Sequence, residues 1–130
     1  MQGISLRLAR PADAAAMTVM QRASWLAAYG HVLGEDLLAQ LAVTELLQIW
    51  RRRLAEPAPI PMLLCQDEVV IGLLYWQPVH EEGLMTARIR ALYLHPDHWR
   101  RGHGKRLWQA VAVQIRRAGC ECVRLWLLDG

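Results

Sequence analysis

The sequence predicts an α/β (α+β) fold with a mixed, mostly antiparallel central sheet flanked by helices. Three observations lead to this prediction. Five short segments have the apolar pattern of strands, others repeat apolar residues at helical spacing, and the order is strand, two helices, three strands, helix, strand. The 130 residues, of which 54% are hydrophobic and 21% charged, suffice for a single folded domain over residues 1–130.

The chain opens with a predicted strand and a predicted helix. Residues 4–9, "ISLRLA", alternate in hydrophobicity with a period of two, as a half-buried strand does. Residues 10–30 predict a helix that starts near Pro11 and Asp13 and ends at Gly30. The small and apolar residues at helical spacing within it are Ala16, Met20, Ala23 and Ala27.

Residues 34–56 predict one or two further helices, with a break at Val43 and Thr44. The apolar residues that share one face are Leu46, Leu47, Trp50 and Leu54. Residues 51–53 are all arginine and fall in the last turn, where cations oppose the negative end of the helix dipole. We therefore expect these arginines to form a solvated helix end.

The second half of the chain predicts four strands and one long helix. Residues 61–79 predict a hairpin, because the short polar "QDE" separates two apolar runs. Residues 86–96 predict a strand, residues 104–120 an amphipathic helix and residues 122–128 a last strand. In the strand at 86–96, one face is predicted to hold Ile89, Ala91 and Tyr93, and the other Arg88, Arg90, Leu92 and Leu94. In the helix, the inward residues are predicted to be Leu107, Ala110, Val111 and Ile115.

Charge and cysteine content narrow the class of protein. The net charge of +3 is a mild basic excess, which suits an anionic ligand as well as a polyanionic partner. No run of about 18 apolar residues predicts a membrane span, and charges interrupt the first residues where a signal peptide is apolar. The three cysteines are odd in number and have no arrangement typical of zinc ligands, so we expect a reduced, cytoplasmic protein without a metal site.

A basic loop, "HPDHWRRGHGKR" at residues 95–106, lies between a predicted strand and a predicted helix. Glycines at 102 and 104 precede a helix start whose backbone N–H groups lack partners, and cations surround them, which predicts a phosphate or pyrophosphate site. The spacing does not fit a P-loop, since Trp99 and Arg106 stand where Gly and Ser or Thr are required. A dinucleotide fingerprint fails for want of a third glycine. Nucleic-acid binding and a solvated loop without a ligand remain as weaker interpretations, because the charge is confined to this loop.

The stretch "LYLHPDHWRRGHGKRLW" resembles the acetyl-CoA-binding motif of the GNAT superfamily of N-acetyltransferases. That motif is an apolar strand, a proline, then Arg or Gln-x-x-Gly-x-Gly or Ala at the start of a long helix. Pro96, Gly102 and Gly104 match it, whereas Trp99 stands where Arg or Gln is commonest. The segments "LRLARPADAAAM", "VVIGLLYW" and "CVRLWLL" are similar to other parts of the family, so the resemblance covers essentially the whole chain. It implies a GNAT-like fold truncated after the fifth strand.

The resemblance implies acetyl-CoA as cosubstrate. Backbone amides of residues 101–105 would hold the pyrophosphate with the help of side-chain charge. The pantetheine arm would pair with the strand, and a backbone N–H would stabilise the oxyanion formed from the thioester. The cofactor-binding residues expected on this basis are Leu92, Tyr93, Leu94, Arg100, Arg101, Gly102, His103, Gly104 and Lys105.

The general base expected in such an enzyme is not evident. Many relatives carry a glutamate on the fourth strand, but Arg88 stands at the aligned position and cannot accept a proton at neutral pH. Glu81 and Glu82 are the weak candidates for a base, and His80 and His31 are further alternatives. Alternatively, Arg88 contacts an acidic acceptor. The acceptor-binding candidates, by their place in the first two helices, are Trp25, Tyr29 and His31.

The favoured function is therefore acetyl-CoA-dependent transfer of an acetyl group to a primary amine of a small molecule or protein. A catalytically weak CoA-binding or interaction module is the alternative, and a nucleic-acid-binding module ranks third. Because the last strand is apolar and the family's later elements are missing, we expect a homodimer or another chain to cover the sheet edge.

Overall fold

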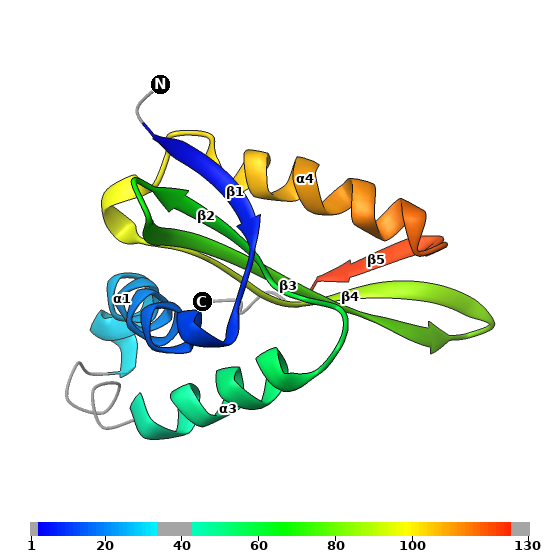
Figure 1. Cartoon of the computed structure of the whole chain (residues 1–130), viewed down its shortest axis with the longest axis horizontal. Helices are drawn as coiled ribbons and strands as arrows, with labels where there is room; N and C mark the ends of the chain where they lie inside the picture. Colours follow the sequence, from blue (N-terminus) through cyan, green and yellow to red (C-terminus); the bar gives the residue numbers. More distant parts are fainter. Residues whose placement is uncertain (1–2, 34–42, 126–130) are drawn as a thin grey trace.

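The structure is a computed structural model that describes residues 3–33 and 43–125, without the side chains of residues 28–33 and 125. A five-stranded sheet in the order β1-β2-β3-β4-β5 forms its centre (Figure 1). Successive neighbours are antiparallel except β4 and β5, which are parallel. The strands are β1 (Ile4–Leu8), β2 (Met62–Gln66), β3 (Val69–Glu81), β4 (Leu84–Leu94) and β5 (Cys122–Leu125). The predicted fold class is confirmed; residues 126–128 of the predicted last strand lie outside the described residues.

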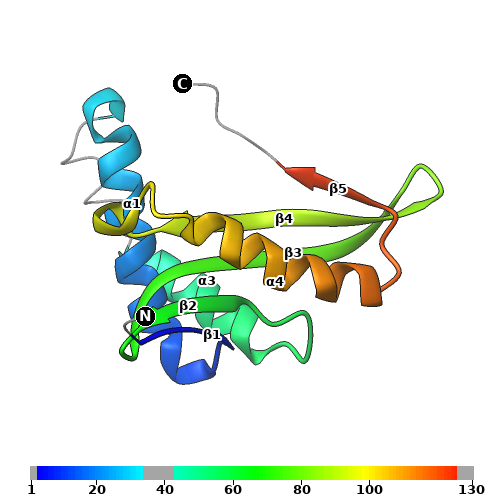
Figure 2. The same ribbon diagram turned by 90° about the horizontal axis from the view of Figure 1, so that it is seen from above.

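Helices cover both faces of the sheet (Figures 1 and 2). Helices α1 (Ala14–Leu33) and α3 (Val43–Ala55) lie on one face, and α4 (His103–Arg117) lies on the other. Two short 3-10 turns precede α1 and α4, η1 (Pro11–Asp13) and η2 (Pro96–His98). No described helix combines the length and apolar character needed to cross a lipid bilayer.

The layer between the sheet and α1 and α3 is built around Trp50. This side chain is fully buried, and its indole N–H donates a 2.7 Å hydrogen bond to Oε1 of Gln21 on α1, which satisfies both buried polar groups. In α1, Ala14, Met17 and Met20 are buried. The predicted helix face is therefore confirmed at Met20, whereas Ala16 and Ala27 are exposed and were predicted wrongly. The face predicted for α3 is confirmed by the burial of Leu46 and Trp50 and the partial burial of Leu47 and Leu54.

The layer between the sheet and α4 confirms the inward residues predicted for that helix. Leu107, Val111 and Ile115 are buried against the sheet, and Ala110 is partly buried. Full burial of an aliphatic side chain contributes about 1.5–3 kcal/mol, so these contacts dominate the docking of α4. Gly72 permits the close approach, because a Cβ there would lie 2.6 Å from Leu94 Cδ2 and 3.1 Å from Leu107 Cδ1.

A bulge in β4 corrects the predicted faces of this strand. Tyr75 pairs with Ala91 and Trp76 pairs with Ile89, so Arg90 is an extra residue in the ladder. Ala87 and Ile89 therefore pack on the α4 side, whereas Ala91 and Tyr93 pack on the α1 and α3 side. Strict alternation had placed Ile89, Ala91 and Tyr93 together, because the period of two does not anticipate an inserted residue.

Candidate functional site

The loop between β4 and α4 is hydrogen-bonded to the ends of two strands, β3 and β4. The His95 N–H donates to the Ile71 carbonyl of β3 at 2.8 Å. The Trp99 indole N–H donates to the Leu94 carbonyl, also at 2.8 Å. Trp99, the residue that departs from the family pattern, thus ties the loop back onto the end of β4 through its ring.

The loop presents a series of backbone donors. Arg100 and Gly102 have φ angles of +63° and +78°, and α4 starts at His103. The first helical hydrogen bond runs from the Arg106 N–H to the Gly102 carbonyl at 3.2 Å. Among the described residues, no acceptor is bound by the N–H groups of residues 101–105. Consecutive free amides at a helix start, with left-handed residues between them, form a concave anion-binding site.

The two glycines of this loop have different structural requirements. Gly102 needs its left-handed conformation, which side chains other than Asn and Asp resist, although the space beside it is open. Gly104 has a helical backbone, and a Cβ there would meet Leu94 Cδ1 at an ordinary 3.5 Å. Position 104 thus accepts Gly or Ala in this packing, whereas position 102 requires conformational freedom.

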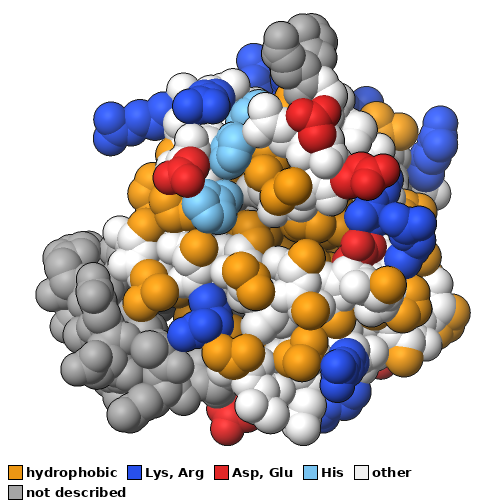
Figure 3. Space-filling model, turned by 60° about the vertical axis from the view of Figure 1, so that its left-hand side comes forward, with side chains coloured by type: hydrophobic (Ala, Val, Ile, Leu, Met, Phe, Trp, Pro, Cys, Tyr) orange, Lys and Arg blue, Asp and Glu red, His pale blue; other side chains and the backbone are white. Residues whose placement is uncertain are grey.

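Histidines gather at this loop, as Figure 3 shows beside Lys and Arg side chains. The ring centroid of His98 lies 6.1 Å from that of His95 and 6.0 Å from that of His103. His103 is buried, and desolvation, followed by the charges of Arg106, His98 and Arg101, lowers its pKa. Its Nδ1 finds no hydrogen-bond partner among the described residues. Within the described part of the chain, no group of His, Cys, Asp and Glu is arranged to hold a metal ion.

The predicted cofactor residues of β4 lie next to this loop. The parallel pairing of β4 with β5 that the structure describes covers Thr86 to Ile89 and does not extend to Leu92, Tyr93 and Leu94. Leu92 is 39% exposed, whereas Leu94 packs with the α4 core. The fold therefore brings the predicted strand residues and the predicted loop residues together at one end of β4.

The candidate bases lie elsewhere, at the hairpin that joins β3 and β4. Glu81 accepts a hydrogen bond from Arg88 Nη2 at 2.8 Å and lies 3.1 Å from Arg124 Nε through its other oxygen. Glu82 lies in the turn and is exposed, 3.9 Å from Arg124. The hairpin end at Leu84 is roughly 20 Å along β4 from Ala91, at about 3.3 Å per residue. Neither carboxylate is brought to the β4 end where the loop lies, and the exposed His80 is in the same hairpin.

Of the acceptor candidates, Trp25 is the one whose side chain is described. Its ring makes an edge-to-face contact with Tyr93 of β4, with centroids 6.1 Å apart. Tyr29 and His31 belong to α1, but their side chains lie outside the described residues. The structure thus places one predicted acceptor residue against one predicted cofactor residue.

Sequence reasoning missed Arg53 and Arg90 on the same face of the sheet. The guanidinium carbon of Arg53 lies 4.9 Å from the ring centroids of both Trp50 and Tyr75, so Arg53 is not the solvated helix end that was predicted. Arg51 and Arg52 are exposed, as expected. The available signal was spacing, because Arg53 follows Trp50 by three residues and shares its helix face.

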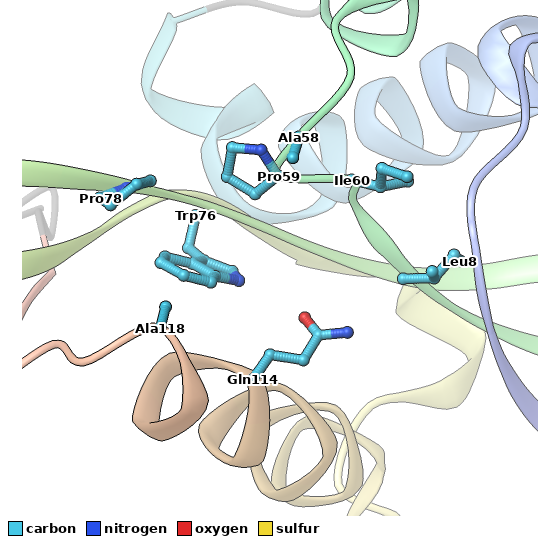
Figure 4. Close-up of a pocket in the computed structure, with 8 residues that line it drawn as sticks. All are labelled: Leu8, Ala58, Pro59, Ile60, Trp76, Pro78, Gln114 and Ala118. Carbon is cyan, nitrogen blue, oxygen red and sulfur yellow. The ribbon is translucent and has the colours of Figure 1, made fainter.

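An apolar pocket of about 360 Å³ lies on the α4 face, away from the loop (Figure 4). It opens between β3 and the last turns of α4, next to the segment that precedes β2. The lining residues are Leu8, Ala58, Pro59, Ile60, Trp76, Pro78, Gln114 and Ala118. Since no charged side chain lines it, this pocket does not suit a pyrophosphate, and the loop at the opposite end of α4 is the better anion site.

Solved structures share this fold. The chain is similar to the PaiA N-acetyltransferase of Thermoplasma acidophilum in complex with coenzyme A, with 22% identity, a TM-score of 0.78, and coverage of 95% of this chain and 79% of that one. It is also similar to a GNAT family acetyltransferase of Brucella melitensis in complex with acetyl-CoA, with 20% identity, a TM-score of 0.72, and coverage of 100% and 79%. A comparison with curated proteins found no match.

The solved structures share low sequence identity with this chain and show the fold alone, whereas a family model shows to which family the chain belongs. The model described as "Acetyltransferase (GNAT) family" matches residues 21–129, which include the β4 strand, the basic loop and α4. This match confirms the resemblance inferred from the loop motif. The chain belongs to the GNAT acetyltransferase family.

Proposed function

We propose that this protein is an N-acetyltransferase that uses acetyl-CoA to acetylate a primary amine of a small molecule or protein. The observation that carries the proposal is the row of backbone N–H groups at residues 101–105, which lie at the start of α4 and have no acceptor among the described residues. Such a row binds a pyrophosphate through short hydrogen bonds and the positive end of the helix dipole.

The side chains of the loop add to this site. Arg100, Arg101 and Lys105 are exposed and cationic. They would form charge-assisted hydrogen bonds with the phosphates at the surface of the protein. His103 is neutral in its buried position and would keep the loop packed on the end of β4. Gly102 and Gly104 would keep the backbone close to the ligand.

The open end of β4 would take the pantetheine arm and the thioester. Leu92, Tyr93 and Leu94 lie beyond the pairing with β5 that the structure describes, and their backbone groups would pair with an extended ligand as with an added strand. A backbone N–H there would stabilise the oxyanion when a neutral amine attacks the thioester carbon. The carbon–nitrogen bond forms, the carbon–sulfur bond breaks, and CoA leaves as the thiolate.

Of the predicted bases whose side chains are described, none lies at this end of β4 to accept the proton of the attacking amine. Glu81 is engaged by two arginines at the far end of the hairpin, and we infer that it serves as their counter-ion. The amine would then bind in its neutral form, and the proton that its nitrogen loses after attack would pass to water. The same observation favours the second candidate, a CoA-binding module with weak catalysis.

One experiment with two measurements tests the acetyltransferase and the CoA-binding module. Calorimetric titration of acetyl-CoA measures binding, and release of free CoA thiol in the presence of a panel of amines measures transfer. Binding at micromolar concentration with amine-dependent thiol release supports the enzyme. Binding without release in any amine supports the module, and no binding of CoA at tens of micromolar rejects both.

We also propose a cytoplasmic location and a second chain along the β5 edge. The three described cysteines are unpaired, which suits a reducing compartment, and the exposed Val123 on β5 suits an apolar contact. Size-exclusion chromatography with light scattering measures the molar mass and so tests for a second chain. A monomer mass at two protein concentrations that differ by about 100-fold would reject this proposal.

A further inference from the structure

Two arginines on the α1 and α3 face of the sheet have no carboxylate partner among the described residues. Arg53, from the last turn of α3, lies over Tyr75 of β3. Arg90, the bulge residue of β4, donates from Nε to Oε1 of Gln77 at 2.8 Å. Gln77 in turn donates from Nε2 to the Tyr75 hydroxyl at 3.0 Å. Tyr75 thus links the two arginines, because one covers its ring and the other reaches its hydroxyl through an amide.

Arg53 is held in surroundings that disfavour its charge. Its side chain is half-buried, and desolvation lowers its pKa, with a further contribution from the like charge of Arg90. The faces of Trp50 and Tyr75 offset part of this cost, but an aromatic face is a weaker partner for a guanidinium than a carboxylate. A charge placed in this way is set to pair with an anion that approaches from outside.

Other arginines on the sheet differ in this respect. Arg7 makes a two-pronged ion pair with Asp13, with both oxygens at 2.8 Å. Arg88 and Arg124 both contact Glu81. Arginines at both ends of the sheet therefore pair with carboxylates. Arg53 and Arg90, which lie between these ends, have no carboxylate partner among the described residues.

We propose that Arg53 and Arg90 bind an anionic group, a carboxylate or a phosphate, on the amine that accepts the acetyl group. This inference rests on the proposed function, because it assumes that the acceptor reaches the thioester at β4 from this face. It moves the acidic-acceptor hypothesis from Arg88, which pairs with Glu81, to Arg53 and Arg90, which have no carboxylate partner among the described residues.

The positions of the two arginines fit an acceptor of modest length. Tyr75 pairs with Ala91 directly beside the bulge, and adjacent strands are about 4.8 Å apart. The anionic group would thus lie about one strand spacing from the part of β4 that precedes Leu92. An amine a few bonds further along would reach the open end of β4, where Tyr93 and Trp25 make their ring contact.

The test compares amines that differ only in charge. β-Alanine is paired with β-alaninamide, and ethanolamine phosphate with ethanolamine, so that the two pairs separate a carboxylate from a phosphate. Thiol release is measured for the natural protein and for the variants Arg53→Gln, Arg53→Lys and Arg90→Gln. Arg52→Gln is the matched control, because it removes the same charge from an exposed position on the same helix.

We expect at least one anionic amine to exceed its neutral partner in kcat/KM by roughly tenfold, the worth of one charge-assisted hydrogen bond. Arg53→Gln and Arg90→Gln should remove most of this preference through KM, with the neutral amines unchanged. Arg53→Lys should retain part of it, and Arg52→Gln all of it. Equal turnover of charged and neutral amines, or a preference that survives both Gln variants, would overturn the proposal.

Binding keeps the proposal testable if no amine is acetylated. Calorimetry of ethanolamine phosphate and β-alanine against the CoA-saturated protein should show binding that Arg53→Gln abolishes and Arg52→Gln preserves. Absence of such binding overturns the inference. Failure of CoA itself to bind is a separate result that rejects the proposed function, and the same anion titration then decides the arginine site in the free protein.

Discussion

Arg88 Nη2 lies 2.8 Å from Glu81 Oε1, and the second oxygen of the same carboxylate lies 3.1 Å from Arg124 Nε. Glu81 thus joins β3 to β4 and β5 at the turn of the β3–β4 hairpin, the end that extends beyond the helices in Figure 2. Arg88 stands at the position where the family resemblance led us to expect a glutamate, and its charge is matched by a carboxylate from the neighbouring strand.

Replacement of Glu81 by Gln should therefore weaken the fold more than the chemistry. It leaves Arg88 and Arg124 without their shared counter-ion, and we expect a loss of about 1–2 kcal/mol in the free energy of unfolding. Urea unfolding measures this, with Glu82→Gln in the exposed turn as control. The kcat for amine acetylation should change less than threefold. A hundredfold fall in kcat, with loss of the acidic limb of its pH profile, would instead make Glu81 the general base.

The two loop glycines should respond differently to the same methyl group. Gly102→Ala forces a side chain into a φ of +78°, which costs about 1–2 kcal/mol and displaces the free amides. We expect the acetyl-CoA dissociation constant to rise roughly tenfold. Gly104→Ala meets only an ordinary contact with Leu94 and should bind within twofold of the natural protein. Calorimetric titration of both variants checks this, and equal losses would show that the loop conformation does not depend on Gly102.

His103 should make stability depend on pH near neutrality. Its pKa is lowered in the folded protein, first by desolvation, so the unfolded chain takes up the proton at a higher pH. The stability associated with neutral His103 is complete above its ordinary pKa of 6.5 and is lost as the pH falls below that value. Melting temperatures between about pH 8 and pH 5 should therefore fall less steeply in His103→Gln. Parallel curves for the two proteins would contradict this.

Asp13 should govern the acid sensitivity of the amino-terminal end. Its carboxylate accepts two bonds from Arg7 and one from the Arg10 N–H at 2.7 Å, and the Arg7 bonds are the main cause of its lowered pKa. The stabilisation is present above the ordinary pKa of 3.8 and is lost as the pH falls below it. Asp13→Asn should cost about 2 kcal/mol at pH 7, by urea unfolding, and less at about pH 3.

The control for this prediction is Asp97, whose side chain is 84% exposed. Asp97→Asn should change the free energy of unfolding by less than about 0.5 kcal/mol at either pH. If Asp13→Asn costs no more than Asp97→Asn, the Arg7 pair contributes nothing measurable to folding.

The loop motif was predictable because its chemistry is local. The free amides belong to one helix start, and Gly102 and Gly104 lie within the same turn of chain, so spacing alone specifies the donors. The inward face of α4 was predictable for the same reason, since a helix repeats at 3.6 residues whatever it packs against. The face of α1 was less clear, because small residues on both sides make Ala16 and Met17 equally plausible as core.

What the sequence by itself determined is therefore the order of strands and helices, the family and the anion-binding loop, all of which depend on neighbours within a few turns. Tertiary structure alone decided the bulge at Arg90, the pairing of Arg88 with Glu81 and the packing of Arg53 on Tyr75. These contacts join segments far apart in the chain, and a one-residue change in strand register turns every later side chain to the opposite face. The charges that surround the proposed acceptor thus follow from how the strands pair.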